Sequence, residues 1–267
     1  MPVLSSTRRS PTDGAAVWLW PGRALYAGPS LRLGPHSGAV ACLAVGVDAP
    51  FTVQPAAGGG ARARTALIAP RVRHRLTAYG DRMVFLYLDP GSADDRACRT
   101  RFRGGEETVL TGHRHEEDLL GGAAELSSRT PLPRVASWVA RATGHAGTRH
   151  AEPRIMAATR RLLDADRPLP AAPLAAELGL SQSRFLRLFR DGTGTSYRRF
   201  RLWAQMHRAA RALAAGHNLT RAAAEGHFAS PSHLSTAFHA MFGLTPSALL
   251  SQDLTIICLD PTPRALT

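Results

Sequence analysis

Serine, arginine and histidine side chains, which can bind phosphate and base edges, are concentrated in two related stretches towards the C-terminal end. The first stretch begins Ser181-Gln182-Ser183 and the second begins Ser230-Pro231-Ser232. Four identities recur 49 residues apart: Ser181 and Ser230, Ser183 and Ser232, Phe189 and Phe238, and Gly194 and Gly243. A solenoid needs about three or more repeats to bury a continuous core. Two copies therefore indicate a small module that has been duplicated.

Positive charge surrounds the first stretch. Between Arg184 and Arg221 the chain carries nine arginines and one acid, Asp191, a net charge of +8. The whole chain has a formal charge of +13 and contains no lysine. Any single arginine could simply be solvated on a helix face, but an imbalance around two repeated units is better explained by a polyanionic partner. Nucleic acid and an anionic membrane surface are the candidates.

Local signals place the first stretch on a helix that follows a tight turn. Residues 173–178 are predicted to form a short helix that ends at Gly179, because glycine readily adopts a positive φ. Ser181 then caps the next helix, in which Phe185 and Phe189 form a buried stripe at i and i+4. A short helix, a glycine turn and a capped helix with a polar outer face predict a helix-turn-helix.

The second stretch repeats this arrangement, with a short helix at 219–225, a turn through Gly226 and His227, and a cap at Ser230. Between the two units, residues 196–215 are predicted to form one helix of about 30 Å. That length is close to the ~34 Å between successive major grooves on one face of B-DNA. Both capped helices could therefore read one duplex.

The segment 228–247, Phe-Ala-Ser-Pro-Ser-His-Leu-Ser-Thr-Ala-Phe-His-Ala-Met-Phe-Gly-Leu-Thr-Pro-Ser, resembles the signature of the AraC/XylS transcription regulators. Leu174, Gly179 and Phe189 fit the first unit of that family, and the resemblance covers roughly 100 C-terminal residues. It implies a DNA-binding domain of two helix-turn-helix units joined by a long helix. More loosely, the N-terminal half is similar to the family's sensor and dimerisation half.

The resemblance also implies DNA contacts. Base contacts are expected on the outer faces of the capped helices, from Gln182, Ser183, Leu186, Arg187, Pro231, Ser232, His233 and Thr236. Phosphate contacts are expected from the caps and nearby cations, Ser181, Arg184, Arg190, Arg198, Arg199, Ser230 and His239. Arg187 can bond a guanine bidentately, which is worth about 1–3 kcal/mol of discrimination. Because Thr236 stands where many relatives have arginine, we expect the second unit mainly to position the protein on phosphate.

One position departs from the family pattern. The family usually has glycine directly before the residue equivalent to Phe228, whereas this chain has His227 there and Gly226 one residue earlier. Two outcomes are open: the turn is rearranged, or His227 adopts a positive φ, which histidine tolerates better than most residues.

The N-terminal residues 14–95 contain short apolar runs broken by glycine and proline, which predict an antiparallel β-sandwich or barrel. We therefore expect a two-domain α+β protein with a cupin-like β-barrel that senses an effector. His36, His74 and Trp20 are the candidate pocket residues. A cupin metal site uses an H-x-H pair, a glutamate and a later histidine, and only Pro70 with His74 echoes this pattern. No metal or other cofactor is therefore expected.

Helical periodicity between Glu116 and Gly144 predicts two amphipathic helices that could cover the β-domain or pair with a second copy. His113 and His115, beside acidic residues, indicate a solvated helix start rather than a metal site. The predicted domains are 14–95 (sensor), 96–150 (helical dimerisation or linker segment), 151–252 (double helix-turn-helix) and 253–267 (tail). The apolar run 254–259 in that tail could either pack or fray.

The remaining features concern compartment and partners. Cys42, Cys98 and Cys258 lack metal or redox spacing, and neither a signal peptide nor a membrane span is recognisable, so a reducing cytoplasm is expected. The expected partners are double-stranded DNA, RNA polymerase, an unidentified small-molecule effector and a second copy of the chain, with no membrane.

Three functions remain open at this point. The first is a one-component transcription regulator, the second a cupin-type metal enzyme fused to a DNA-targeting domain, and the third an effector-independent architectural DNA binder. We favour a non-enzymatic regulator, because neither a metal triad nor a Ser/His/Asp or Cys/His nucleophile motif can be assembled from the sequence.

Overall fold

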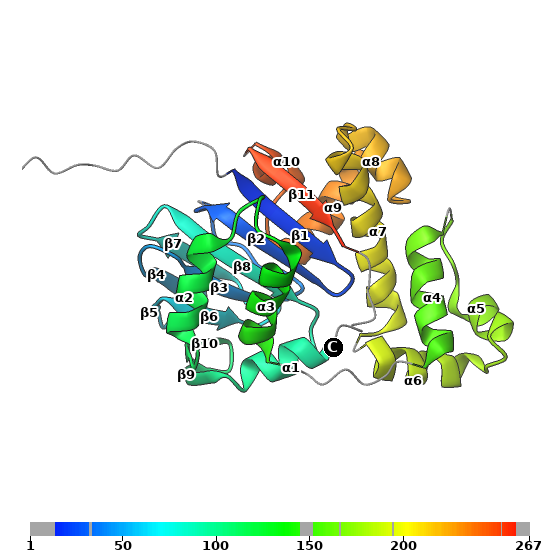
Figure 1. The fold of residues 1–267 in the computed structure, drawn as a ribbon, viewed down its shortest axis with the longest axis horizontal. Coiled ribbons are helices and arrows are strands. Elements are labelled where there is room, and N and C mark those ends of the chain that lie inside the picture. The colour runs from blue at the N-terminus through cyan, green and yellow to red at the C-terminus, as the bar shows by residue number, and fades with distance from the viewer. Residues whose placement is uncertain are drawn as a thin grey trace, which may run out of the picture.

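The computed structural model describes residues 14–31, 34–144, 152–165, 167–193, 195–251 and 253–259. Figure 1 shows a β-rich N-terminal domain beside a helical C-terminal domain, so the predicted two-domain α+β class is confirmed. Within the described residues, no helix is both long and apolar enough to cross a membrane.

Two sheets form the N-terminal domain. The larger sheet has the order β11-β1-β2-β8-β3-β6-β10-β9, and the smaller has the order β5-β4-β7. The strands of the larger sheet are β1 (Ala15–Trp20), β2 (Arg23–Pro29), β3 (Ala41–Gly46), β6 (Thr65–Ile68), β8 (Arg82–Leu88), β9 (Phe102–Glu106), β10 (Val109–His113) and β11 (Leu254–Cys258). Those of the smaller sheet are β4 (Phe51–Pro55), β5 (Ala61–Ala63) and β7 (His74–Ala78).

The predicted barrel is not closed. Pairing is antiparallel throughout the described sheets except at one edge, where β11 runs parallel to β1. Because β11 pairs with β1, and β4 pairs with β5 and β7 in a separate sheet, the strands make an open cupin-like arrangement.

Helices cover one face of the larger sheet. These are α1 (Ala93–Arg99), α2 (Glu116–Glu125) and α3 (Leu132–Thr143). Trp18 of β1 and Leu86 of β8 pack against Leu119 of α2 and Val135 of α3 in one buried cluster. The indole nitrogen of Trp138 donates a hydrogen bond to the carbonyl oxygen of Leu119 at 3.0 Å, which ties α3 to α2.

Seven further helices make up the described part of the C-terminal domain. They are α4 (Pro153–Asp164), α5 (Ala171–Glu177), α6 (Gln182–Thr193), α7 (Tyr197–Ala214), α8 (Leu219–Glu225), α9 (Pro231–Phe242) and α10 (Pro246–Leu250). The first unit, α4 to α6, has a core of its own, in which the rings of Phe185 and Phe189 each contact Tyr197 with centroids 5.4 and 5.2 Å apart.

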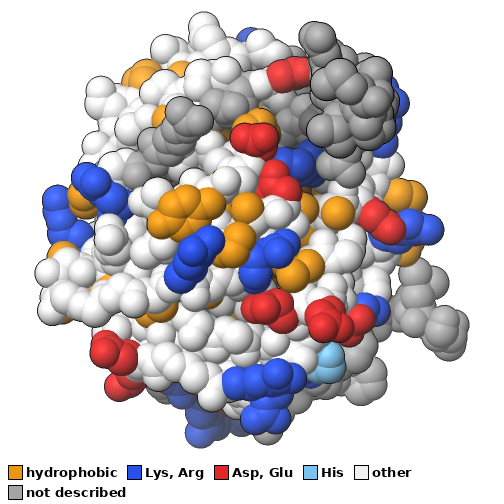
Figure 2. Space-filling view, turned by 90° about the vertical axis from the view of Figure 1, so that its left-hand side faces the viewer, with side chains coloured by type: hydrophobic (Ala, Val, Ile, Leu, Met, Phe, Trp, Pro, Cys, Tyr) orange, Lys and Arg blue, Asp and Glu red, His pale blue; other side chains and the backbone are white. Residues whose placement is uncertain are grey.

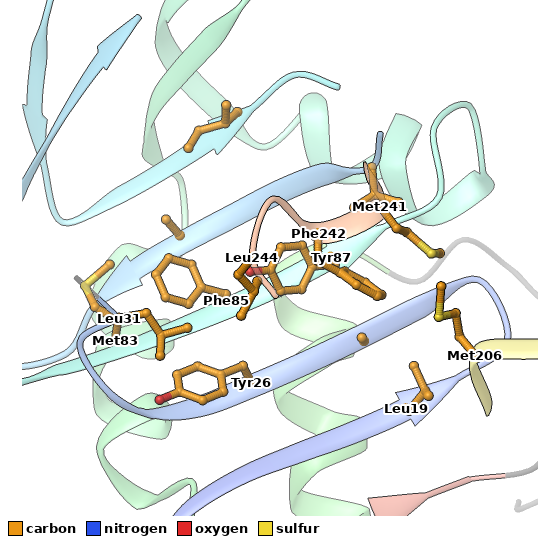
Figure 3. Close-up of a cluster of buried hydrophobic side chains, with 14 of the residues drawn as sticks. Leu19, Tyr26, Leu31, Met83, Phe85, Tyr87, Met206, Met241, Phe242 and Leu244 are labelled. Carbon is orange, nitrogen blue, oxygen red and sulfur yellow. The ribbon is translucent and has the colours of Figure 1, made fainter. Parts of the chain in front are cut away.

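The second unit shares its core with the sheet. Leu19, Tyr26 and Tyr87 on the strands lie in the same buried cluster as Met206 of α7 and Phe242 of α9 (Figure 3). The rings of Tyr87 and Phe242 meet edge to face, with centroids 5.2 Å apart. The first unit therefore projects from a body formed by the N-terminal domain and the second unit (Figure 1).

Two predicted domain boundaries need correction. Residue 95 does not end the β-domain, because β9 and β10 extend the larger sheet beyond it. Four of the five β9 residues are exposed, so this strand lacks the apolar alternation that marks strands in a sequence. In the tail, residues 254–258 form β11, hydrogen-bonded beside β1. The predicted linker residues 145–151, together with Gly194 and residues 260–267, lie outside the described residues.

Candidate nucleic-acid interface

Helix α6 exposes the polar face predicted from the sequence. Gly179 forms the preceding turn with a φ of +67°. The hydroxyl of Ser181 accepts a hydrogen bond from the backbone nitrogen of Arg184 at 3.4 Å, while Phe185 and Phe189 are fully buried. The predicted contact residues of this unit are all exposed, namely Ser181, Gln182, Ser183, Arg184, Leu186, Arg187 and Arg190.

Helix α9 presents an outer face of different chemistry. Ser230 caps the helix, since its hydroxyl accepts a hydrogen bond from the backbone nitrogen of His233 at 3.1 Å. Pro231 is half-buried, and the exposed predicted contacts are Ser230, Ser232, His233, Thr236 and His239. The His233 ring also packs edge-on against Phe228 with centroids 5.5 Å apart, which limits its freedom to reach a base.

The turn of the second unit is built around His227. Its φ is +57°, so the second of the two outcomes left open by the sequence is confirmed. The side chain is held in place because Nε2 lies 3.0 Å from the carbonyl oxygen of Ala165. Gly226 serves another purpose: a Cβ there would lie 2.9 Å from the Phe228 ring and 3.0 Å from the carbonyl oxygen of Gln205. Glycine therefore allows close packing while histidine adopts the left-handed conformation.

Helix α7 joins the two units (Figure 1). Ser196 caps it, and its 18 residues correspond to a length of about 27 Å. The prediction of one long helix between the units is therefore confirmed, at a length comparable to the spacing of successive major grooves.

Some of the nine arginines are already engaged within the protein. Arg208 donates to the carbonyl oxygen of Leu162 at 2.7 Å and so caps α4, and Arg221 pairs with Glu225 at 2.8 Å. Arg199, which we expected to bind phosphate, instead pairs with Asp89 at 2.5 Å. The prediction that Arg199 contacts phosphate is therefore wrong, because its guanidinium is held by Asp89. Arg184, Arg187, Arg190 and Arg198 remain exposed.

Asp89, just after β8, is a residue that the sequence analysis missed. Its carboxyl group is completely buried and accepts hydrogen bonds from the Thr195 hydroxyl, from Nε of Arg199 and from the indole nitrogen of Trp203, the last at 3.1 Å. All three donors belong to the start of α7 or the residues before it. In the sequence, Asp89-Pro90-Gly91 indicates only a turn, so no local signal could reveal this contact between domains.

His36 and His74 lie together, with ring centroids 4.5 Å apart. Each Nδ1 is 2.9 Å from a backbone carbonyl oxygen two residues earlier, that of Gly34 or Val72. Burial lowers the pKa of His74, and the nearby charge of His36 lowers it further. The rings line a cavity of about 20 Å³, room for about one water molecule. Within the described residues, no three His, Cys, Asp or Glu side chains are grouped to hold a metal ion.

Trp20 does not face that cavity. Alternation along β1 places Trp20 with Trp18 on the face covered by α2 and α3, where it packs against the buried cluster. The guanidinium carbon of Arg23 lies 5.1 Å from the centroid of its ring. The prediction that Trp20 lines a pocket with the two histidines is therefore wrong.

One face of the N-terminal domain carries charges of both signs. On the N-terminal side shown in Figure 2, arginines are interspersed with aspartates and glutamates around a band of hydrophobic side chains. Such mixed charge does not favour a polyanion. The exposed face of α6, with three arginines in seven residues, is the better candidate for contact with nucleic acid.

Comparison with known proteins identifies the domain to which α6 belongs. Residues 174–252, which span both helix-turn-helix units from α5 to α10, match a family model described as a helix-turn-helix domain. Residues 174–252 form an AraC-type helix-turn-helix domain. The resemblance predicted from the sequence is therefore confirmed for this domain. The comparison with curated proteins found no match.

Solved structures similar to the chain include ToxT from Vibrio cholerae O395, with 13% identity, a TM-score of 0.46, and coverage of 86% of this chain and 96% of ToxT. A DNA-binding transcriptional dual regulator from Escherichia coli K-12 has 23% identity and a TM-score of 0.32, covering 37% of this chain and 86% of its own. The C-terminal domain of AraT, a response regulator from Geobacillus stearothermophilus, has 18% identity and a TM-score of 0.35, covering 43% and 96%.

Proposed function

We propose that this protein is a one-component transcription regulator that binds a specific DNA sequence and responds to a small-molecule effector. The observation that carries the proposal is the AraC-type domain over residues 174–252, in which α6 exposes three arginines. In a helix-turn-helix the second helix lies in the major groove, where arginine reads guanine through two hydrogen bonds.

The two units have different roles in this proposal. Helix α6 reads bases, with Arg187 as the main reader and Gln182, Ser183 and Leu186 beside it. Helix α9 has no arginine on its outer face and positions the protein on phosphate through its capped N-terminus at Ser230. Helix α9 is docked on the sheet, whereas α6 packs in a separate core against the start of α7 and leaves its outer face exposed.

Control by an effector follows from the shared core of the second unit and the sheet. An effector regulates DNA binding only when its affinity differs between two arrangements of the protein. One such arrangement is the docked one, in which residues of the sheet and of α7 to α9 are buried together in a single hydrophobic cluster. RNA polymerase and a second copy of the chain are the proposed partners on DNA, and the protein acts without catalysing a reaction.

The test is genome-wide footprinting with the purified full chain, followed by gel-shift titration on the sites recovered. We expect discrete sites, and we expect Arg187→Ala to weaken their preference over unrelated DNA by about 1–3 kcal/mol. Arg129→Ala is the matched control, because it removes one exposed arginine from the N-terminal domain. Uniform, sequence-independent coverage by the wild-type chain would rule out the proposal.

A further inference from the structure

An apolar cavity lies between the larger sheet and the second helix-turn-helix unit. Its volume is about 80 Å³, against about 20 Å³ for the cavity beside the two histidines. Protein interiors are packed at the density of organic crystals, with few voids larger than a water molecule. A cavity of this size in the core that joins two domains destabilises the docked arrangement unless it is filled.

Both domains contribute walls to this cavity. Val17 and Leu19 of β1 and Tyr26 of β2 lie on one side. Met206 of α7 and Phe242 of α9 lie on the other, and Figure 3 shows several of these side chains converging from strands and helices. Anything bound here contacts the sheet and the second unit at once, and therefore favours the arrangement in which they are docked.

The chemistry of the lining restricts the ligand. None of the described lining residues is charged, and the polar side-chain groups among them are the hydroxyls of Tyr26 and Tyr87. The Tyr26 hydroxyl already donates to the carbonyl oxygen of Pro29 at 2.8 Å. Burying a charged group without a partner is costly, and water gains little in a space lined by hydrocarbon. The cavity therefore suits an uncharged molecule with at most one hydrogen-bonding group.

The cavity also has an entrance. Leu249 and Leu250 of the short helix α10 line it, and Leu250 remains 39% exposed although it is a large hydrophobic residue. A ligand can therefore enter beside α10 without unfolding the sheet.

We propose that this interdomain cavity, rather than the space beside His36 and His74, binds a small, uncharged, hydrocarbon-rich molecule. The occupant stabilises the docking of the second helix-turn-helix unit on the sheet. This inference rests on the proposed function for its regulatory consequence, a change in DNA affinity, but the binding itself is independent of that function.

The first experiment is titration calorimetry on the full chain with hexan-1-ol and with hexanoate, which share a carbon chain and differ in charge. We expect one binding site for hexan-1-ol and at least about tenfold weaker binding of hexanoate, because the anion has no cation to pair with. Failure of hexan-1-ol to bind, or equal binding of both compounds, would overturn the inference.

Two substitutions on α7 locate the site. Ala210 lines the cavity and Ala214 is exposed on the same helix, so Ala210→Met fills the cavity whereas Ala214→Met adds the same side chain outside it. We expect Ala210→Met to weaken hexan-1-ol binding about tenfold or more and Ala214→Met to leave it unchanged. If Ala210→Met fails to fold, Ala24→Val fills the cavity from β2. Unchanged binding in a folded cavity-filling variant would contradict the assignment.

Gel-shift titrations on a footprinted site, with and without hexan-1-ol, separate the two proposals. Absence of specific DNA binding both with and without hexan-1-ol would contradict the proposed function and leave the calorimetric result standing. Binding of hexan-1-ol with no change in DNA affinity would refute the regulatory consequence alone.

Discussion

Replacing Asp89 with alanine tests whether the buried contact between the domains holds α7 on the N-terminal domain. The Asp89 side chain is 0% exposed, and its removal leaves the Arg199 guanidinium, the Trp203 indole nitrogen and the Thr195 hydroxyl without their acceptor. Breaking a buried ion pair by removing one partner costs about 3–5 kcal/mol. Because the Arg199 side chain is 31% exposed and can be partly rehydrated, we expect the lower end, about 3 kcal/mol.

The assay is equilibrium urea unfolding followed by circular dichroism and by tryptophan fluorescence, which together detect separate unfolding of the two domains. Asp94→Ala is the control, because Asp94 pairs with Arg23 at 2.7 Å but both side chains are about a quarter exposed. Such a pair contributes about 0–1 kcal/mol. A double-mutant cycle with Arg199→Ala should give a clear coupling energy. A loss below about 1 kcal/mol for Asp89→Ala, or additivity in the cycle, would refute the role assigned to this contact.

Three further expectations concern DNA reading, the second turn and pH. In gel-shift titrations, Arg187→Ala should lose about 1–3 kcal/mol of discrimination at one base pair whereas Thr236→Ala should lose much less, and equal losses would refute the division between reader and anchor. In thermal or urea unfolding, His227→Ala should lower the free energy of unfolding by about 1 kcal/mol, because alanine keeps the positive φ and loses the hydrogen bond to Ala165. His227→Gly should be close to neutral, because glycine relieves the backbone strain of the positive φ and this offsets the lost bond. A glycine variant as unstable as the alanine variant would contradict this account. Burial lowers the pKa of His113 to about 4, so the folded state keeps this ring neutral and its contribution to stability is complete above pH ~6.5 and is lost as the pH falls towards 4. The loss amounts to about 3 kcal/mol of unfolding free energy. Urea unfolding between pH 7 and 4 should show a shallower pH dependence of stability for His113→Gln than for the wild type. Parallel pH curves for the two proteins would argue against this role of His113.

Local sequence signals were sufficient for the helix-turn-helix units. Caps at Ser181 and Ser230, the positive φ of Gly179 and the buried pair Phe185 and Phe189 depend on residues within about one or two helical turns. Even the unusual turn at His227 could be narrowed to two outcomes, because only a few residue types tolerate a positive φ. Contacts of this range are encoded by neighbours in the chain.

Other features required partners far apart in the sequence. Arg199 has the same local surroundings as Arg198, and only the arrival of Asp89, 110 residues earlier, decides that one pairs inside the protein while the other stays exposed. Strand β9 exposes most of its residues and so carries no alternating pattern that would predict it. Pairing between distant strands depends on the register of the whole sheet rather than on local preference.

The sequence by itself thus determined the duplicated module, its capped helices and its basic outer face, because these depend on short-range periodicity and composition. The tertiary structure alone decided which arginines face solvent, that the chain returns as β11 to the edge of the first strand, and that the second unit closes an apolar cavity against the sheet. Burial in a shared core is a property of two surfaces brought together, and neither surface carries a local signal for its partner.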